Sequence, residues 1–212
     1  KLRCFGYHFV GYDTCDNYER CVILRHDIDY SIDKALILAE LEAKQGVKST
    51  YFTLLSSQFY NLISRENKEK LQYINSLGHD IGLHFDELNY EGRQVKEQCE
   101  SLIINEVELM ENILQLNIKC VSMHRPSRET LEANYNLDPI INSYGQKFFN
   151  DFKYISDSRH KWRENVDKII EDGNFNKLHI LTHAFWYNNE NEELEESIKK
   201  FVNSANIERY YT

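Results

Sequence analysis

The sequence has few residues that interrupt a fold. Its 212 residues include two prolines and eight glycines, and no stretch resembles a linker, a repeat or a low-complexity tract. We therefore expect one domain over residues 1–212, which is long enough to bury a substantial core. The first residue is Lys1 rather than methionine, which leaves room for a targeting segment upstream.

Two further absences concern the partners of the protein. No apolar run approaches the ~18 residues that a membrane span requires, so we expect no integral membrane segment. No lysine or arginine cluster interrupts the formal net charge of -9, and phosphate binding needs a basic footprint. Nucleic acid is therefore not expected as the main partner. The acidic stretch at 190–197 is typical of a solvated helix face.

The cysteines are scattered, and none form a CxxC pair: Cys4, Cys15, Cys21, Cys99 and Cys120. Their odd number and irregular spacing argue against a disulfide framework and against a thiolate zinc site. The simplest interpretation is that they are reduced, structural thiols in a cytoplasmic protein.

What the sequence does contain is an alternation of short apolar runs with longer amphipathic stretches. The runs that read as strands are 21–26, 47–55, 79–85, 119–123, 139–142, 152–155 and 177–182. The helical patterns are 32–45, a stretch ending near residue 77, 93–116, 161–172 and 190–204. This order predicts an α/β fold of parallel strands with right-handed crossovers. About seven strands suit a small, incomplete (β/α) barrel, and a doubly wound open sheet is the competing architecture.

Polar residues gather where several of these strands end, which is where a barrel of this kind carries its chemistry. The first strand runs into Arg25-His26-Asp27-Ile28-Asp29. Because side chains alternate along a strand, Asp27 and Asp29 point to one side. Asp27 follows an apolar run, so it needs a partner where it is buried. Asp29 is alternatively a turn residue or a helix N-cap.

The third and fourth strands both end in histidine. His84 lies near the end of a strand in which histidines and aspartates interleave with apolar residues. His124 and Arg125 close the next strand, and Pro126 marks its exit because proline cannot continue a ladder. They are candidates for a metal ligand and an anion-binding side chain. Alternatively, a strand histidine is a hydrogen-bonded core residue and Arg125 a surface residue.

The last strand places His179, Leu181 and His183 on one face, and aromatic residues follow it. A histidine at such a strand end suits acid–base chemistry. Asp157, after the sixth strand, is either another carboxylate of the site or a helix N-cap. Aspartate and histidine thus recur at successive strand ends, which is the composition of a zinc-type site with acid–base groups.

These motifs, in this order, resemble the polysaccharide deacetylase (NodB-homology) superfamily, the family-four carbohydrate esterases. The similarity runs from about Val22 to Trp186 and looks closest to a branch with an Arg-His-Asp-x-Asp first motif. Its most specific segments are 25–52 and 78–84, the latter similar to Gly-His-Glu-Ile-Gly-x-His. The family's fold is a distorted (β/α) barrel, in agreement with the alternation of elements.

The resemblance implies roles for individual residues. Asp27 matches the catalytic base, Asp29 the metal-binding aspartate and His84 the first histidine of the metal pair. The family's second histidine falls at Leu88, so this chain departs from the pattern there. His124 is the candidate replacement, because the third motif has a polar residue two positions before its proline.

Asp86 and His79 are weaker alternatives as metal ligands. Asp157 and Trp162 resemble the motif whose aspartate orients the catalytic histidine and whose tryptophan lines the site. His183, in the final Leu-x-His motif with Leu181, matches the general acid. The remaining assignments are Arg125 or Arg25 as the charge partner of Asp27, and Tyr51, Phe185 and Trp186 as an apolar wall for substrate.

The resemblance therefore implies a hydrolase that uses a divalent metal ion, zinc first among them, to remove an acetyl group from an N-acetylated sugar of a glycan or glycan precursor. One alternative is a metal-free hydrolase of a cyclic amide or imide on the same fold. Another is a non-catalytic carbohydrate-binding or assembly protein, which the departure at Leu88 motivates. The sugar, the metal and the oligomeric state stay open.

Overall fold

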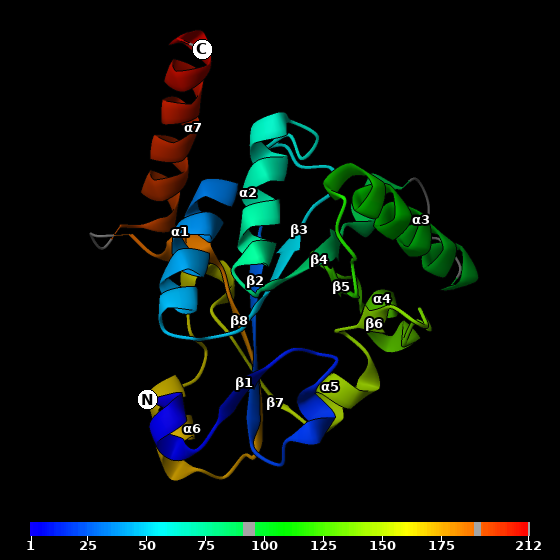
Figure 1. The fold of residues 1–212 in the computed structure, drawn as a ribbon, viewed down its shortest axis with the longest axis vertical. Coiled ribbons are helices and arrows are strands. Elements are labelled where there is room, and N and C mark those ends of the chain that lie inside the picture. Colours follow the sequence, from blue (N-terminus) through cyan, green and yellow to red (C-terminus); the bar gives the residue numbers. More distant parts are fainter. Residues whose placement is uncertain (91–95, 189–191, 212) are drawn as a thin grey trace.

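Strands and helices alternate along the chain, and every strand pair that the structure describes is parallel (Figure 1). The computed structural model describes residues 1–90, 96–188 and 192–211, the last seven of these only as part of a helix. The strands are β1 (His8–Val10), β2 (Cys21–Ile28), β3 (Thr50–Thr53), β4 (Asp80–Phe85), β5 (Cys120–Met123), β6 (Ile141–Asn142), β7 (Lys153–Ser156) and β8 (Lys177–Thr182). The α-helices are α1 (Ile32–Lys44), α2 (Arg65–Ser76), α3 (Lys96–Leu114), α4 (Arg128–Ala133), α5 (Gln146–Asn150), α6 (Val166–Asp172) and α7 (Leu194–Tyr211).

The strands form one curled sheet in the order β6-β5-β4-β3-β2-β8-β7. From β2 to β6 the chain adds each new strand to the same side, and β8 returns to the other edge of β2. β1 lies against the first residues of β2, ahead of β3 on the same edge. Because the sheet winds in one direction, it is an open (β/α) barrel rather than a doubly wound sheet. The predicted fold class is confirmed.

The alternation of side chains gives the sheet an outer and an inner face. The outer face packs against α1, α2 and α3 through residues that include Ile28, Tyr51, Ile81, Leu83 and Val121. The inner face holds a second core, built around Ile23, Phe52, Phe148 and Phe152. Gly82 makes room for this interior, because a Cβ at that position would lie 2.5 Å from the Phe52 ring.

All seven predicted strands are present, with limits shifted by a few residues. Among the strands and α-helices that the structure describes, β1, α4 and α5 were not predicted from the sequence. Each is too short to show a periodic pattern of its own. The last predicted helix before β8 begins later than expected, at Val166. The helical predictions for residues 93–95 and 190–191 lie outside the described residues.

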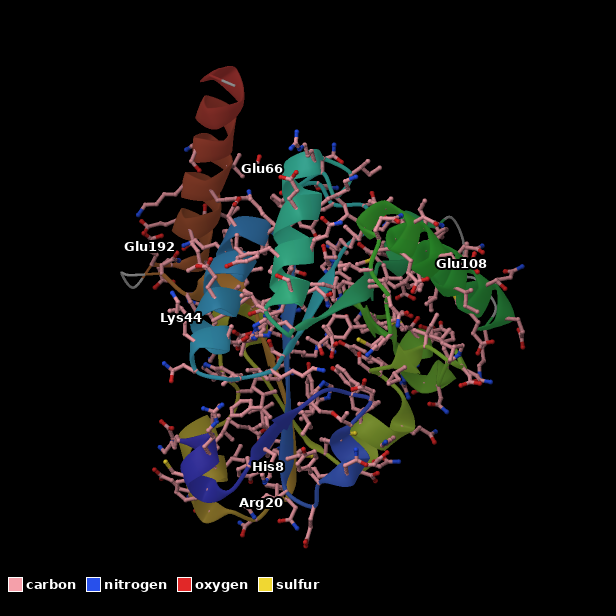
Figure 2. The ribbon with its side chains drawn as sticks, viewed as in Figure 1. His8, Arg20, Lys44, Glu66, Glu108 and Glu192 are labelled. Carbon is pink, nitrogen blue, oxygen red and sulfur yellow. The ribbon has the colours of Figure 1, made fainter. Side chains whose placement is uncertain are left out.

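The outer helices present charged side chains away from the sheet. Figure 2 shows Lys44, Glu66 and Glu108 on α1, α2 and α3, and all three are exposed. The helix α7 extends beyond the sheet at the top of Figure 1. Of the helices that the structure describes, none has the length and apolar character needed to cross a bilayer.

Candidate active site and metal centre

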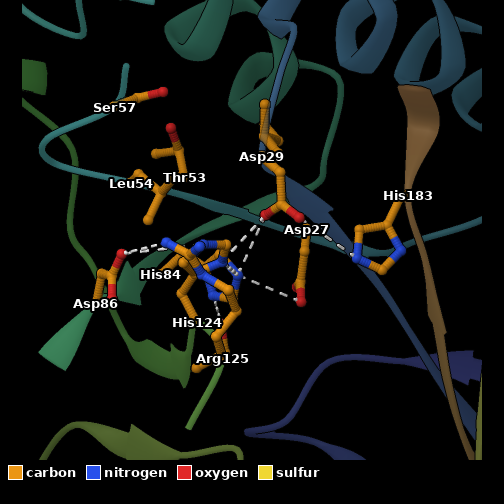
Figure 3. Close-up of polar contacts among 12 residues, drawn as sticks. Asp27, Asp29, Thr53, Leu54, Ser57, His84, Asp86, His124, Arg125 and His183 are labelled. Carbon is orange, nitrogen blue, oxygen red and sulfur yellow. Dashed lines mark hydrogen bonds and ion pairs between the residues drawn. The ribbon is translucent and has the colours of Figure 1, made fainter. Parts of the chain in front are cut away.

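The carboxyl ends of the strands open into a cavity of about 760 Å³. Its walls come from the last residues of the strands and from the segments that follow β2, β3, β4, β5, β6, β7 and β8. Among the residues that line it are Asp27, Asp29, His84, His124, Leu181 and His183. Figure 3 shows Asp29 between the two histidines His84 and His124 on one side and His183 on the other. The predicted metal-binding and acid–base residues therefore meet in one place.

Strand β2 contributes Arg25 and Asp27 to the inner face, and Asp29 directly follows its last residue. Arg25 is fully buried and donates to both carboxylate oxygens of Asp27, from Nε at 3.1 Å and from Nη2 at 2.6 Å. Burial raises the pKa of Asp27, but the charge and hydrogen bonds of Arg25, together with His84 and His183, outweigh it and the net pKa is lowered. Asp27 is therefore an ionised carboxylate held in a fixed orientation.

Asp29 is free to serve the site because the N-cap of α1 is a different residue. The hydroxyl of Ser31 accepts the backbone N–H of Lys34 at 3.3 Å, which is the capping contact. The Oδ1 atom of Asp29 is buried and has no hydrogen-bond partner. Burial opposes its charge, but the neighbouring His124 and His84 outweigh that cost and hold the pKa of Asp29 well below its usual range.

His84 and His124 approach this orphaned oxygen from neighbouring strands. His84 Nε2 and His124 Nδ1 each lie 3.4 Å from Asp29 Oδ1, and 3.2 Å from each other. The two 3.4 Å separations to Asp29 are long for hydrogen bonds. Tetrahedral zinc with ligands at about 2.1 Å requires donor atoms about 3.4 Å apart. Within the described chain, Asp29, His84 and His124 form a His/Asp group that fits a divalent metal ion.

On the opposite side of Asp29, His183 is held by a carboxylate. Its Nδ1 lies 2.6 Å from Asp157 Oδ1, and its backbone N–H donates to Asp157 Oδ2 at 3.1 Å. Asp157 occupies an N-cap position but makes no capping hydrogen bond, so its side chain serves His183 instead. Burial lowers the pKa of His183, but the hydrogen bond to Asp157 and the negative charges of Asp27, Asp29 and Asp157 together outweigh it, and the net pKa is raised.

Arg125 and Tyr51 differ from their predicted places, and Phe185, predicted for the apolar wall, is buried and is not among the residues that line the cavity. Arg125 does not contact Asp27: its Nη2 donates to Asp86 at 3.1 Å, and its side chain is 66% exposed. Arg25 takes the place next to Asp27. Tyr51 is fully buried on the outer face, where its hydroxyl donates to Glu42 at 2.8 Å, so it does not line the cavity. The corrections at Arg125 and Tyr51 follow from strand alternation, which places Arg25 with Asp27 and Tyr51 with His26.

The tryptophans lie at different distances from the centre. Trp186 lines the cavity, and its ring packs beside His183 with centroids 5.9 Å apart. Trp162 is 38% exposed and lines a smaller hollow with Asp157, behind Trp186. The cavity wall also contains aromatic residues that the sequence did not single out: Tyr30, Phe59, Tyr144 and Tyr154. No sequence pattern identified these four residues as part of the site, because they lie in loops or on the short strand β7.

His79 and Asp86, the weaker candidates for metal ligands, both lie outside the three-residue group. His79 faces the outer side of the sheet, where its ring nitrogens contact Ser49 Oγ and the Ala39 carbonyl, so it is remote from the metal group. Asp86 lies at the cavity beside His124 but outside the three-residue group. Leu88, at the position where the resemblance expects histidine, lines the cavity and is 68% exposed.

Comparisons with known proteins show likeness of structure. No family model matches the chain, and no curated protein sequence matches it. The structure is similar to the Xyl-CE4 domain of a multidomain xylanase from the hindgut metagenome of Trinervitermes trinervoides, at a TM-score of 0.48 and 12% identity over 90% of this chain and 84% of that chain. It is also similar to a family 4 acetyl xylan esterase from Clostridium thermocellum in complex with a cobalt ion. Here the TM-score is 0.49 and the identity 12%, over 88% of this chain and 84% of that chain.

A third similar structure is a CE4 family pseudoenzyme from Bacillus anthracis, with a TM-score of 0.49 and 13% identity over 89% of this chain. This chain spans 62% of the pseudoenzyme's length. At such identities, the roles of individual residues rest on the geometry of this chain.

Proposed function

We propose that the protein is a divalent-metal-dependent deacetylase that removes an acetyl group from an N-acetylated sugar. One observation carries the proposal: three metal-type donors lie 3.2–3.4 Å apart in a cavity that also holds a carboxylate–arginine pair and a histidine–carboxylate pair. A water-activating group, a base and an acid are what amide hydrolysis requires.

The metal would be held by Asp29, His84 and His124. Two imidazoles and one carboxylate suit zinc, and they also accept cobalt, nickel and iron. Three protein ligands leave a coordination position open, as catalytic zinc sites do. Such an ion, when bound, polarises a carbonyl oxygen and lowers the pKa of a water molecule. His124 supplies the donor that the resemblance expects at Leu88.

Asp27 would act as the base. It lines the cavity, and its Oδ2 lies 3.5 Å from His84 Nε2, so it stands directly beside the proposed ligands. Arg25 fixes both oxygens of Asp27 and keeps the carboxylate ionised before it takes a proton from the attacking water. The water oxygen then bonds to the acetyl carbon.

His183 would act as the acid. Because Asp157 engages Nδ1, the other ring nitrogen, Nε2, faces the cavity and lies 3.7 Å from Asp29 Oδ2. The raised pKa of His183 favours the protonated ring, which can donate from Nε2 to the departing amine. As the C–N bond breaks, acetate and a free amino sugar result.

The aromatic wall supports a carbohydrate substrate. Tyr30 stacks on Phe185 with ring centroids 4.6 Å apart and lies 5.6 Å from the Trp186 ring. Tyr30, Phe59 and Trp186 form one side of the cavity. Aromatic side chains offer apolar faces with polar edges, which suits a sugar ring, and the cavity volume lies in the usual range for small ligands.

Acetate release tests the proposal. The protein, purified without chelator or a polyhistidine tag, is incubated with oligomers of N-acetylglucosamine and with other N-acetylated sugars. We expect acetate release that stops after chelation and returns with added zinc or cobalt. Hydrolysis of cyclic amides that persists under chelation would favour the metal-free alternative. Sugar binding without acetate release by the zinc-loaded protein would favour the binding-protein alternative.

A further inference from the structure

The two histidines of the metal group present different ring nitrogens to Asp29. His84 directs Nε2 toward it, while its Nδ1 lies 2.7 Å from Ser122 Oγ. His124 directs Nδ1 toward it, while its Nε2 faces the other way, 3.9 Å from Asp86 Oδ2. A neutral imidazole carries its proton on one nitrogen only. The hydrogen-bond partner of the nitrogen that points away from Asp29 therefore decides whether the other nitrogen has a lone pair for a metal.

Asp86 is built to stay beside His124. It is 8% exposed, and its Oδ1 accepts the backbone N–H of Leu88 at 3.1 Å, which fixes the start of the turn after β4. Its Oδ2 accepts from Arg125 Nη2 at 3.1 Å. Arg125 follows His124 directly and has a left-handed backbone, with φ of 46°. The chain thus places the histidine and the arginine on the same carboxylate.

We propose that His124 binds the metal through Nδ1 and that Asp86 orients it by accepting a hydrogen bond from Nε2–H. The inference rests on the proposed metal site and assigns Asp86 as a positioning residue. A shift of about 1 Å closes the present separation to hydrogen-bond length. Carboxylates in this position fix the tautomer of a metal-bound histidine and raise its basicity.

Ring-nitrogen spectra test which atom binds. The full-length protein, labelled with ¹⁵N at histidine and loaded with ¹¹³Cd, is examined for cadmium–nitrogen coupling. We expect coupling to Nε2 of His84 and to Nδ1 of His124, with the His124 proton on Nε2. Coupling to Nε2 of His124 would overturn the inference and leave the metal site intact. A wild-type chain that binds neither cadmium nor zinc would overturn both the inference and the proposed function.

Variants at Asp86 provide the second measurement. We expect Asp86→Ala to weaken zinc binding about 10- to 100-fold, the usual effect of losing such a partner. Asp86→Asn keeps one acceptor oxygen only. With that oxygen on Leu88 N–H, its NH2 group faces His124 and cannot accept from Nε2–H. We therefore expect Asp86→Asn to keep the turn after β4 but to lose zinc affinity about as much as Asp86→Ala.

Glu106→Gln is the matched control for these variants. It removes an equally buried carboxylate (8% exposed) that accepts from Tyr90. We expect its zinc affinity to stay within twofold of the wild type. Wild-type affinity in a folded Asp86→Ala variant, or equal losses in Asp86→Ala and Glu106→Gln, would overturn the positioning role.

Discussion

In the part of the chain that the structure describes, two clusters bring a carboxylate together with two histidines, one on each face of the same sheet. The inner cluster is Asp29 with His84 and His124. The outer cluster, Glu42 with His26 and His79, lies between the sheet and α1. Glu42 Oε1 lies 2.8 Å from His26 Nε2, and Oε2 accepts from Ser49 at 2.6 Å and from Tyr51 at 2.8 Å.

The difference between the clusters lies in what remains unsatisfied. Both carboxylate oxygens of Glu42 have partners at hydrogen-bond distance, and Tyr51 and His79 beside it are sealed from solvent. In the inner cluster, Asp29 Oδ1 has no hydrogen bond, and the three donors line an open cavity. A satisfied network stabilises a fold, whereas an unsatisfied one leaves lone pairs for a ligand. Residue types alone do not distinguish the two.

The largest effect should come from Asp27→Asn, which removes the proposed base without touching the three metal donors. We expect turnover to fall 10²- to 10⁴-fold, the usual contribution of general acid–base catalysis, while bound metal is retained. Arg25 loses its charge partner in this variant, so acetate release is measured at a temperature where circular dichroism shows a folded protein. Asp33→Asn, an exposed partner of Lys70, is the control. Turnover within tenfold of the wild type would contradict the role of Asp27.

Metal affinity should separate the histidines of the two clusters. We expect His124→Ala to weaken zinc binding more than 100-fold, which exceeds the loss expected from removing a hydrogen-bond partner of a ligand, such as Asp86. His79→Ala, in the outer cluster, should leave zinc affinity unchanged because His79 contacts Ser49 and the Ala39 carbonyl. Isothermal titration calorimetry measures both. Full zinc affinity in His124→Ala would show that His124 is not a ligand.

For the free energy of unfolding we expect the reverse order, with a larger effect at Glu42 of the outer cluster than at Asp29 of the inner cluster. Glu42→Gln weakens three hydrogen bonds in a buried network, and we expect a loss of about 1–3 kcal/mol in the free energy of unfolding. Asp29→Asn in the metal-free protein removes the charge attraction to His84 and His124, each 3.4 Å away, but breaks no hydrogen bond at Oδ1. We therefore expect its loss to be smaller than that of Glu42→Gln. Urea denaturation compares the two. A larger loss in Asp29→Asn would contradict the division between a stabilising and a ligand-binding cluster.

The smallest effect concerns His179, a third kind of buried histidine, in the barrel interior. Burial, together with the charge of Arg25, lowers its pKa to about 3, and Tyr12 OH lies 2.7 Å from its Nε2. In the unfolded chain a histidine titrates near 6.5. Below that pH the unfolded state binds a proton that the folded state does not, so stability should fall as pH falls from about 6.5 toward 3.

His179→Gln tests this dependence because glutamine keeps an acceptor for Tyr12. We expect urea denaturation at pH 7 and pH 5 to show a smaller difference in the variant than in the wild type. His8→Gln, at an exposed position, should retain the wild-type difference. An unchanged difference in His179→Gln would show that another group causes it.

Much of the fold was predictable because its strands are short continuous apolar runs and its helices have clear periodicity. The placement of Asp29, His84 and His124 in one cavity follows from a further rule: parallel strands bring their carboxyl ends to the same edge. The short elements β1, α4 and α5 could not be predicted, since too few residues define them.

The remaining errors concern which face a side chain occupies. Asp27 pairs in register with Phe52, so Tyr51 lies with His26 on the outer face. This could be found only once the register between β2 and β3 was known. Strand alternation, by contrast, already places Arg25 on the same face as Asp27, whereas the position of Arg125 depends on the fold of the loop after β5. The nitrogen that each histidine presents depends on ring orientation, which no sequence pattern encodes.

The central claim is that the chain binds a metal without a histidine at position 88. Elemental analysis of the protein, purified without chelator and reconstituted with zinc, tests it most directly when the wild type and His84→Ala are compared. The account predicts close to one metal ion per chain in the wild type and loss of that ion in His84→Ala. A wild type that holds no metal after reconstitution, or an undiminished content in His84→Ala, would contradict it.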